Sequence, residues 1–413
     1  MNIYLVIILG ILTANYILKL LIELLNISRA NPVLPSEFQD YYDADKYKRS
    51  QNYLRENTYF SLTHDALLTA IFIVSILTGG FNFIDRLARV FNCGVVLTGL
   101  IFAVIIFLGL ELIELPFSVY HTFVIEKKYG FNRTRIKTFI ADILKSWMLA
   151  LAIGGTIFSA VVWFFLNMGK SGWVWCWLGV SVAKIFIIFI SPLMILPLFN
   201  KFTPLEEGET KEAIKKYAEA QGFRMKGIFT MDGSKRSSKS NAFFTGFGKY
   251  RRIVFFDTLL KQHPTEEIVA ILAHEMGHYK KCHLLKSSII GIFTNAVMFF
   301  ILSLFIDNPQ LFEAFKMQNI SIYASIFFFS FLYAPINMVI SMFALFASRK
   351  HEYEADHYAF TTYQKSEAFI SALKKLTVNN LSNLTPHPLK VFLQYTHPPV
   401  LQRIAALRQM QSK

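Results

Sequence analysis

The chain of 413 residues is 54% hydrophobic, 15% aromatic and only 17% charged, and it carries a formal net charge of +14. This composition excludes an ordinary soluble globule and favours a membrane protein. The basic residues lie in loops beside apolar stretches, where anionic lipid accounts for them, so no nucleic-acid partner is indicated. The scattered Cys93, Cys176 and Cys282 lack the spacing of a disulfide framework or a thiolate metal site.

Seven apolar stretches run along the chain, each able to cross about 30 Å of hydrocarbon, which takes roughly 20 helical residues. They lie near Ile3–Leu25, Ala66–Ile84, Gly94–Leu115, Trp147–Leu166, Trp173–Leu198, Ser287–Ile306 and Ile322–Phe346. The first is expected to be a retained helix, because no basic segment precedes it and no small-residue cleavage site follows it. The sequence therefore predicts a mainly α, polytopic membrane protein.

The basic residues divide unevenly between two sets of loops, and this difference predicts an orientation. The loops after the first and third spans hold Arg29, Lys46, Lys48, Arg49, Arg55, Lys127, Lys128, Arg133, Arg135 and Lys137. The opposite loops hold Arg86, Arg89, Lys170 and Lys316. The richer side is predicted to be cytoplasmic, and the same parity places residues 199–286 and 348–413 there.

Segment 199–286 has the pattern of a soluble insertion. We expect an amphipathic helix at Glu209–Gln221 and short strands at Gly227–Met231 and Arg251–Phe256. An aromatic run between the strands could pair with an extended peptide, although an ordinary hairpin strand fits the pattern equally well. This candidate substrate-binding run comprises Asn241, Ala242, Phe243, Phe244 and Thr245.

A helix predicted from Thr265 onward carries His274, Glu275 and His278 in the spacing His-Glu-x-x-His. Two imidazoles four residues apart project from one helical face and can share one Zn²⁺ ion, while the carboxylate lies beside the metal's water. Zinc lowers the pKa of that water toward about 7, and a neighbouring carboxylate can accept its proton and pass it to the leaving amine. The motif predicts a zinc metalloprotease with Glu275 as general base.

A third histidine further along the same helix does not complete the site. Lys281 and Leu284 occupy the positions where the extended metalloprotease pattern requires glycine and histidine. His283 falls one residue short of the required position, and we expect it to face solvent or the membrane interface. The third protein ligand is therefore expected from another part of the chain.

The polar segment after the seventh span offers Glu352 and Glu354 as candidate ligands on the motif's side of the membrane. Glu352 is favoured, because Asp356 lies one helical turn further along the same face and can hydrogen-bond a liganding imidazole. The tail adds His397, which precedes two prolines, and Arg403. Such residues are more often structural, yet the site needs a donor for the developing oxyanion.

Together these residues resemble the type I CAAX prenyl protease family of membrane gluzincins. The similar stretches are Phe123–Thr134, Pro197–Leu205, Asn241–Gly246, Ser348–Asp356 and His397–Pro399 with Arg403, so the resemblance covers nearly the whole chain. It implies that Glu352 is the third zinc ligand and that Asp356 orients a liganding histidine. It also implies that His397 and Arg403 lie beside the active site and that Asn241 begins the strand that holds substrate.

The resemblance further implies seven helices around an intramembrane chamber, with the zinc site at its cytosolic end. Such a chamber would account for Glu111, Glu114, Lys184 and Asn295, which are costly against lipid, although the glutamates could equally lie at the interface. We expect two domains. Residues 1–200 form a five-helix membrane domain, and residues 201–413 form a zinc metalloprotease domain that includes the helices near 287–306 and 322–346 and a cytosolic tail.

The predicted function is that of an integral-membrane zinc endopeptidase acting near the C-terminus of isoprenylated CaaX-type or other membrane-associated peptides. One alternative is a membrane quality-control protease without a prenyl requirement. Another is a metal-binding transporter or channel, which Glu275 disfavours because a structural zinc site has no use for it. Peptide substrate and membrane lipid are the expected partners, and no oligomer is implied. The end at Lys413 lacks an endoplasmic-reticulum retention signal, which is compatible with a prokaryotic origin. A prokaryotic member is expected in the cell inner membrane and a eukaryotic one in the endoplasmic reticulum membrane.

Overall fold

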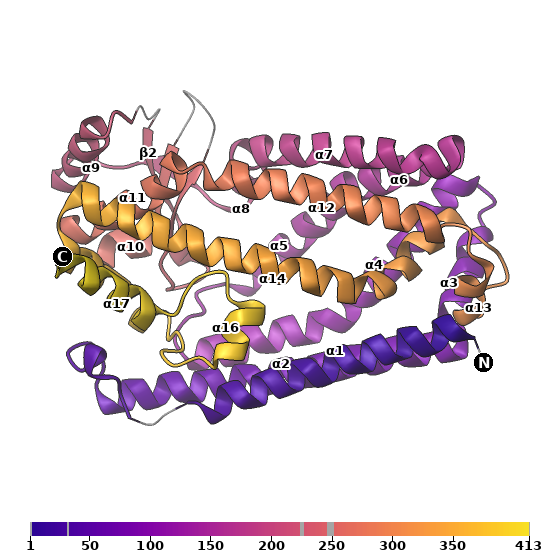
Figure 1. Ribbon diagram of the computed structural model, residues 1–413, viewed down its shortest axis with the longest axis horizontal. Coiled ribbons are helices and arrows are strands. Elements are labelled where there is room, and N and C mark those ends of the chain that lie inside the picture. Colours follow the sequence, from indigo (N-terminus) through magenta and orange to yellow (C-terminus); the bar gives the residue numbers. More distant parts are fainter. Residues whose placement is uncertain (1, 31–32, 224–226, 246–251, 413) are drawn as a thin grey trace.

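Long helices lie side by side along the longest axis of the molecule, and a small sheet lies at one end of them (Figure 1). The computed structural model describes residues 2–30, 33–223, 227–245 and 252–412. Within these residues, seven helices are long and apolar enough to cross a membrane. The predicted fold class, a mainly α polytopic protein with a small sheet, is confirmed.

The candidate membrane helices are built partly from segments joined by π-helical turns. They are α1 (Ile3–Ser28), α2 (Ala44–Thr78), α4 (Val95–Tyr120) with the π-turn His121–Glu126, α5 (Ile136–Leu149) joined through Ala150–Gly154 to α6 (Gly155–Met168), α7 (Gly172–Ile190) joined through Ser191–Ile195 to α8 (Leu196–Phe199), α12 (His283–Phe305) and α14 (Ile322–Tyr363). The short α3 (Gly80–Arg89) and α13 (Pro309–Ala314) lie at the end opposite the sheet (Figure 1).

The second predicted span, Ala66–Ile84, is wrong at both ends. Helix α2 begins at Ala44, where the Asp43 side chain caps it by accepting a hydrogen bond from the Lys46 backbone N–H at 2.6 Å. It ends at Thr78, because Gly79 adopts the left-handed conformation with φ 79° that commonly closes a helix. Hydropathy detected only the apolar half of a longer helix.

Helix α14 is one continuous helix of 42 residues that includes both the predicted seventh span and the polar segment after it. At 1.5 Å per residue it is about 63 Å long, roughly twice the thickness of a bilayer's hydrocarbon core. Its apolar half crosses the bundle and its polar half extends to the end where the sheet lies (Figure 1). Glu352 thus lies on the same helix that forms the seventh span.

The remaining elements gather at that end. The helices are α9 (Glu209–Ala220), α10 (Asp257–Gln262), α11 (Thr265–Lys280), α15 (Ser366–Asn379), α16 (Pro388–Gln394) and α17 (Val400–Gln411), with 3-10 turns at Ser36–Phe38 and Gly233–Lys235; a further 3-10 turn, Gly169–Ser171, joins α6 to α7 at the opposite end. The strands β1 (Phe202–Pro204), β2 (Gly227–Met231), β4 (Arg252–Phe256) and β3 (Ala242–Thr245) pair in that order. Only β2 and β4 are parallel. Gly246 and Arg251, which belong to predicted runs, lie outside the described residues.

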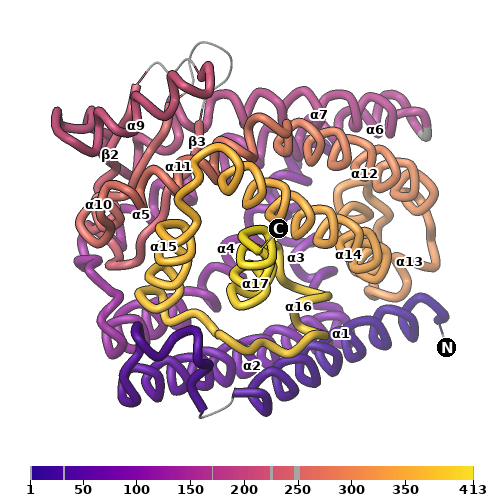
Figure 2. The backbone as a smooth tube through the Cα atoms, turned by 60° about the vertical axis from the view of Figure 1, so that its left-hand side comes forward, coloured from indigo at the N-terminus to yellow at the C-terminus, as the bar shows by residue number. Residues whose placement is uncertain are grey.

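Helix α11 is the centre of the extramembrane core. The six residues from Ile268 to Ala273 are all buried, as is Met276, so the helix is covered on every side. Helices α14, α15 and α9 pack against it, and α17 in turn packs against α15 and α14 (Figure 2). A helix enclosed in this way holds its side chains in fixed positions.

Polar side chains within the candidate spans contact neighbouring helices. Glu111 accepts a hydrogen bond from the Trp147 indole at 2.7 Å, and Glu114 lies 2.8 Å from a ring nitrogen of His64. The Lys184 ammonium packs closely against Gly291 of α12, where an added methyl group would collide with it. These contacts offset part of the cost of placing polar groups in a bilayer.

A buried ion-pair cluster anchors the first turn of α11. The Glu267 carboxylate is 4% exposed and contacts a ring nitrogen of His263 at 2.7 Å and the Lys375 ammonium of α15 at 2.6 Å. Burial alone raises the pKa of Glu267, but the hydrogen bonds from His263 and Lys375 outweigh burial and hold the pKa below its usual value. The charged carboxylate thus ties α11 to α15.

Replacing Glu267 with alanine is expected to lower the free energy of unfolding by about 3 kcal/mol, because removing one member of a buried pair leaves the other uncompensated. The neighbouring Glu266 is a matched control, since it pairs with Lys365 at the same 2.6 Å distance but is exposed. Its replacement should cost less than about 1 kcal/mol. Unfolding of both variants in detergent, followed by tryptophan fluorescence, tests this difference; equal losses would contradict it.

Candidate metal and catalytic site

His274 and His278 lie one turn apart on α11, and their rings converge. The Nε2 atoms of the two imidazoles are 3.2 Å apart. The surrounding helix is buried, which fixes both side chains on the face that turns toward α14. The predicted spacing therefore brings the Nε2 atoms of both imidazoles close enough to bind the same ion.

A glycine allows α14 to approach that point. A Cβ atom added at Gly277 would lie 2.9 Å from Ala355 Cα and 3.0 Å from the Ala355 carbonyl oxygen, closer than real Cβ atoms ordinarily come to other atoms. The two helix backbones are thus in direct contact, at a distance that a larger residue would not permit. This contact sets how near Glu352 and Asp356 come to the histidines.

Glu352 reaches the two imidazoles from α14. Its carboxylate is 4% exposed, with Oε1 3.2 Å from His278 Nε2 and Oε2 3.5 Å from His274 Nε2. His397 Nε2 lies 3.3 Å from the same carboxylate and Arg403 Nη1 lies 3.4 Å from it. Of the described residues that could hold a metal, His274, His278 and Glu352 place their ligand atoms within 4.8 Å of one another.

These three residues fit a zinc ion. Donor atoms of a tetrahedral zinc site lie about 3.3 Å apart when each bond to the metal is about 2.0–2.1 Å long, and the observed separations are 3.2 to 3.5 Å. Glu352 Oε2 is buried and accepts no hydrogen bond within the described parts of the chain, since the nearest donors, Arg403 Nη1 at 3.4 Å and His274 Nε2 at 3.5 Å, make only long contacts with it. A buried acceptor of this kind is costly unless a cation or a donor satisfies it.

Asp356, itself paired with Arg403, contacts the Nδ1 side of the His274 ring. The His274 Nδ1 atom lies 2.8 Å from Asp356 Oδ1. Arg403 donates from Nε and Nη2 to the two oxygens of Asp356 at 2.8 and 2.6 Å. Burial alone lowers the pKa of His274, but the neighbouring carboxylates of Asp356 and Glu352 outweigh burial and raise the pKa to about 9. When Nε2 holds a metal ion instead of a proton, Asp356 would keep the remaining proton at Nδ1 and so fix the orientation of the ring.

Glu275 follows His274 on α11. Burial raises the pKa of its carboxyl group above the ordinary value. A carboxyl group with a raised pKa exchanges protons more readily near neutral pH, as a general base and acid must. The neighbouring cationic side chains counter part of this shift.

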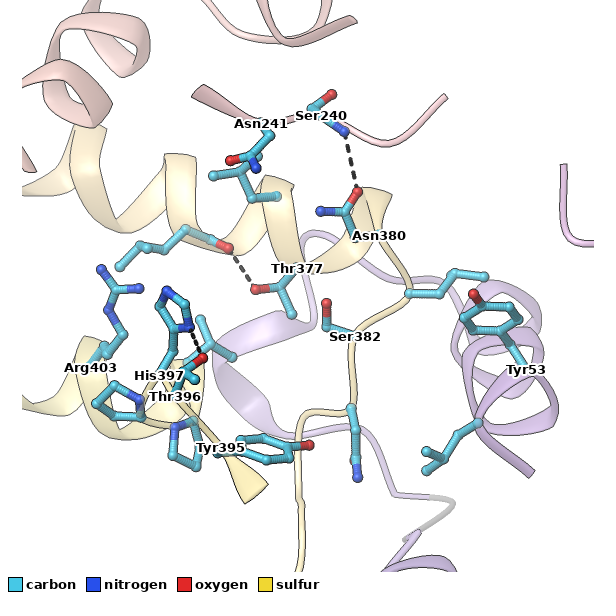
Figure 3. A pocket seen from close by; sticks show the side chains of 18 of the residues that line it. Tyr53, Ser240, Asn241, Thr377, Asn380, Ser382, Tyr395, Thr396, His397 and Arg403 are labelled. Carbon is cyan, nitrogen blue, oxygen red and sulfur yellow. Dashed lines mark hydrogen bonds between the residues drawn. The ribbon is translucent and has the colours of Figure 1, made fainter. Parts of the chain in front are cut away.

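His397 enters the site on the loop that precedes α17, and its side chain is exposed. The hydroxyl of Thr396 lies 2.8 Å from its Nδ1 atom (Figure 3). Arg349 of α14 holds this loop, since Nη1 donates to the carbonyl oxygens of Val391 and Tyr395 at 3.0 and 2.8 Å. Sequence reasoning did not single out Arg349 by itself, although it lies in one of the stretches that carry the resemblance.

A cavity of about 810 Å³ opens beside His397 and Arg403 (Figure 3). Its other walls include Asn241, Tyr53 of α2 and Asn380. The lining carries amides and hydroxyls and no carboxylate among the described residues. The site is thereby connected to a space of the size that peptide or small-molecule ligands occupy.

The candidate substrate-binding run is only partly at this cavity. Asn241 lines it, and Ala242–Thr245 form β3, an edge of the sheet among the described strands. Ala242 is buried, whereas Phe243 and Phe244 are half-buried. Thr245 lines a separate cavity of about 290 Å³. The edge position agrees with the strand prediction, while its contact with substrate stays a prediction.

His283 does not face solvent or the membrane interface, so that expectation is wrong. It is 4% exposed, with Nδ1 2.9 Å from His278 Nδ1 and Nε2 3.0 Å from Glu354 Oε2. Glu354, the rival ligand candidate, thus contacts His283. The reason is the sharp turn at Cys282, whose left-handed φ of 56° directs the first residue of α12 back toward α11. No sequence pattern marks that turn.

His274, His278 and Glu352 converge on the Glu275 helix at one end of a bundle of candidate membrane helices, as expected of an integral-membrane metalloprotease. Two family models match the chain: one described as "CAAX prenyl protease N-terminal, five membrane helices" over residues 23–201, and "Peptidase family M48" over residues 204–411. The chain belongs to the CAAX prenyl proteases of peptidase family M48.

Individual relatives agree over almost their whole length. The chain is 33% identical to a CAAX prenyl protease 1 homolog of Oryza sativa over 92% of each protein. It is 34% identical to CAAX prenyl protease 1 of Saccharomyces cerevisiae, over 92% of this chain and 89% of that protein. The crystal structure of S. mikatae Ste24p is similar with a TM-score of 0.93 and 31% identity, covering 98% of this chain and 99% of that one. The predicted family is confirmed.

Proposed function

We propose that this protein is a zinc endopeptidase that cleaves peptide bonds near the C-terminus of prenylated CaaX-type or other membrane-associated peptides. The observation that carries the proposal is the convergence of His274, His278 and Glu352 beside Glu275. The names of the relatives support a prenylated substrate. The two family models meet between residues 201 and 204, which supports a membrane domain over 1–200 and a protease domain over 201–413.

The mechanism assigns a separate task to each residue. Zinc, when bound by His274, His278 and Glu352, acts as a Lewis acid on the scissile carbonyl and lowers the pKa of a water molecule toward about 7. Glu275 accepts the proton of the attacking water and passes it to the leaving amine. His397 is the favoured donor to the developing oxyanion, because it is exposed beside Glu352 while Arg403 is engaged by Asp356.

The site is proposed to face the cytosol. The sheet, α11 and α17 lie at one end of the bundle (Figure 1), and the basic loops after the first and third spans belong to the same side by parity. Asn241 and β3 are proposed to align the peptide by pairing along the free strand edge. The substrate's reacting bond would then enter from the cavity that His397 and Arg403 line.

Removing Glu352 is expected to weaken zinc binding by more than about 100-fold, beyond the loss that follows when only a residue behind a ligand is removed. Zinc content and peptide cleavage are measured for the wild type, Glu352→Ala and the control Glu354→Gln. The proposal predicts zinc and activity in the wild type and the control only. Zinc retained by Glu352→Ala would overturn the ligand assignment.

The same assay with prenylated and unprenylated versions of one peptide tests the substrate class. Preferential cleavage of the prenylated peptide supports CaaX processing, and equal cleavage of both supports a protease without a prenyl requirement. A zinc-loaded wild type that cleaves neither peptide would overturn the endopeptidase proposal.

A further inference from the structure

A chain of two hydrogen bonds leads from His278 to Glu354. His278 Nδ1 lies 2.9 Å from His283 Nδ1, and His283 Nε2 lies 3.0 Å from Glu354 Oε2. The three residues come from three different helices, α11, α12 and α14. The His351 ring is stacked on His283 with centroids 4.1 Å apart and planes at 11°, which fixes the plane of the His283 ring.

The hydrogen bonds allow only one arrangement of protons when His278 binds a metal through Nε2. A liganding Nε2 offers its lone pair, so the proton of neutral His278 is on Nδ1 and points at His283. His283 Nδ1 must then accept, which places the His283 proton on Nε2. From there it is donated to the Glu354 carboxylate, which can only accept. The proton position on His278 therefore determines the proton position on His283, and that in turn requires an acceptor at Glu354.

We infer that His283 and Glu354 are positioning residues that fix the orientation and tautomer in which His278 presents Nε2 to zinc. The inference rests on the proposed function, because it assumes that His278 is a zinc ligand. It assigns to His278 a support equivalent to the one that Asp356 gives His274 at 2.8 Å. Each imidazole of the motif is thus held at Nδ1 from behind, one by a carboxylate directly and one through a second imidazole.

Without an acceptor at residue 354, His283 is no longer held in its Nε2-protonated form. In its other tautomer, its Nδ1 proton would point at the Nδ1 proton of His278, and the two N–H groups would repel each other. His278 relieves this conflict only by rotating or by moving its proton to Nε2, and either change removes the metal ligand. Loss of such a partner typically weakens metal binding by about 10–100-fold.

The test compares Glu354→Leu with Glu354→Gln. The Glu354 side chain is 31% exposed, so a small residue would admit water as a substitute acceptor, whereas leucine excludes water and accepts no hydrogen bond. Glutamine keeps an acceptor oxygen. Zinc affinity is measured by competition with a chromophoric chelator, and the ligand field is measured by the visible absorption of the Co²⁺-substituted protein.

We expect Glu354→Leu to weaken zinc binding by about 10–100-fold and to change the Co²⁺ spectrum, with Glu354→Gln within about threefold of the wild type. His263→Phe is the control for general destabilisation. His263 is also a buried histidine, but it contacts Glu267 at 2.7 Å and is not one of the residues that contact His278. It should lower the unfolding temperature without changing zinc affinity.

Unchanged zinc affinity and spectrum in Glu354→Leu would overturn the inference, as would equal losses in Glu354→Gln and Glu354→Leu, since charge rather than an acceptor would then matter. A wild type that binds no zinc would overturn the proposed function itself. The two failures are therefore distinguishable in one series of measurements.

Discussion

Replacing Glu275 with glutamine is expected to lower kcat by about 10²–10⁴-fold while the zinc content stays at the wild-type level. Glutamine has the size of glutamate, so the packing of α11 is retained, but its amide cannot accept a proton from water. Glu275 is outside the group of three close ligand residues, which is why the metal should remain. Cleavage rates and zinc content measured on the same preparations test both halves of this expectation.

The matched control for that experiment is Glu266→Gln, an exposed glutamate on the same helix. It should leave kcat and zinc content unchanged. Full activity in Glu275→Gln would eliminate Glu275 as general base, and loss of zinc in that variant would show instead that Glu275 holds the metal.

Gly277→Ala is expected to weaken zinc binding by more than tenfold and to lower the free energy of unfolding by about 1–3 kcal/mol, the usual cost of overpacking. The added methyl group would meet Ala355 Cα at 2.9 Å and the Ala355 carbonyl oxygen at 3.0 Å. Both are backbone atoms that cannot rotate away, so α11 and α14 must separate. Glu352 then moves away from the two histidines. Zinc affinity and thermal unfolding measure the two effects.

The sign of the stability change makes the Gly277 experiment informative. Alanine ordinarily stabilises a helix interior relative to glycine, by roughly 0.5–1 kcal/mol. Gly109 in α4 provides the control, because no atom of another described element lies within 4 Å of a Cβ added there. Gly109→Ala should therefore be neutral or stabilising. A stabilised Gly277→Ala variant with normal zinc affinity would contradict the close-contact account.

Residue spacing and hydropathy were sufficient for much of the architecture. The seven spans follow from long apolar runs, and the convergence of His274 and His278 follows from a separation of four residues on a helix. The proximity of Glu352 needed an argument from membrane parity, since 74 residues separate it from His278 along the chain. The geometry agrees with that argument, and zinc ligation by Glu352 remains a proposal.

Other features depend on backbone geometry that single residues do not reveal. Helix α2 begins 22 residues before the predicted Ala66. Hydropathy cannot show this, because the first part of the helix is polar and has no long apolar run. His283 was misplaced because its burial depends on a left-handed turn at Cys282, a residue type with no preference for that conformation. Arg349 acts through carbonyl oxygens of a loop more than 40 residues away.

The unbroken course of α14 has a mechanical consequence. One end of this rod is embedded in lipid and the other carries Glu352, so axial sliding that accommodates a thicker or thinner bilayer would carry the carboxylate with it. A slip of one residue is about 1.5 Å, three times the roughly 0.5 Å that a catalytic arrangement tolerates. The close contact between Gly277 of α11 and the backbone of Ala355 opposes such sliding. The fit would thereby limit how far a change in bilayer thickness displaces Glu352.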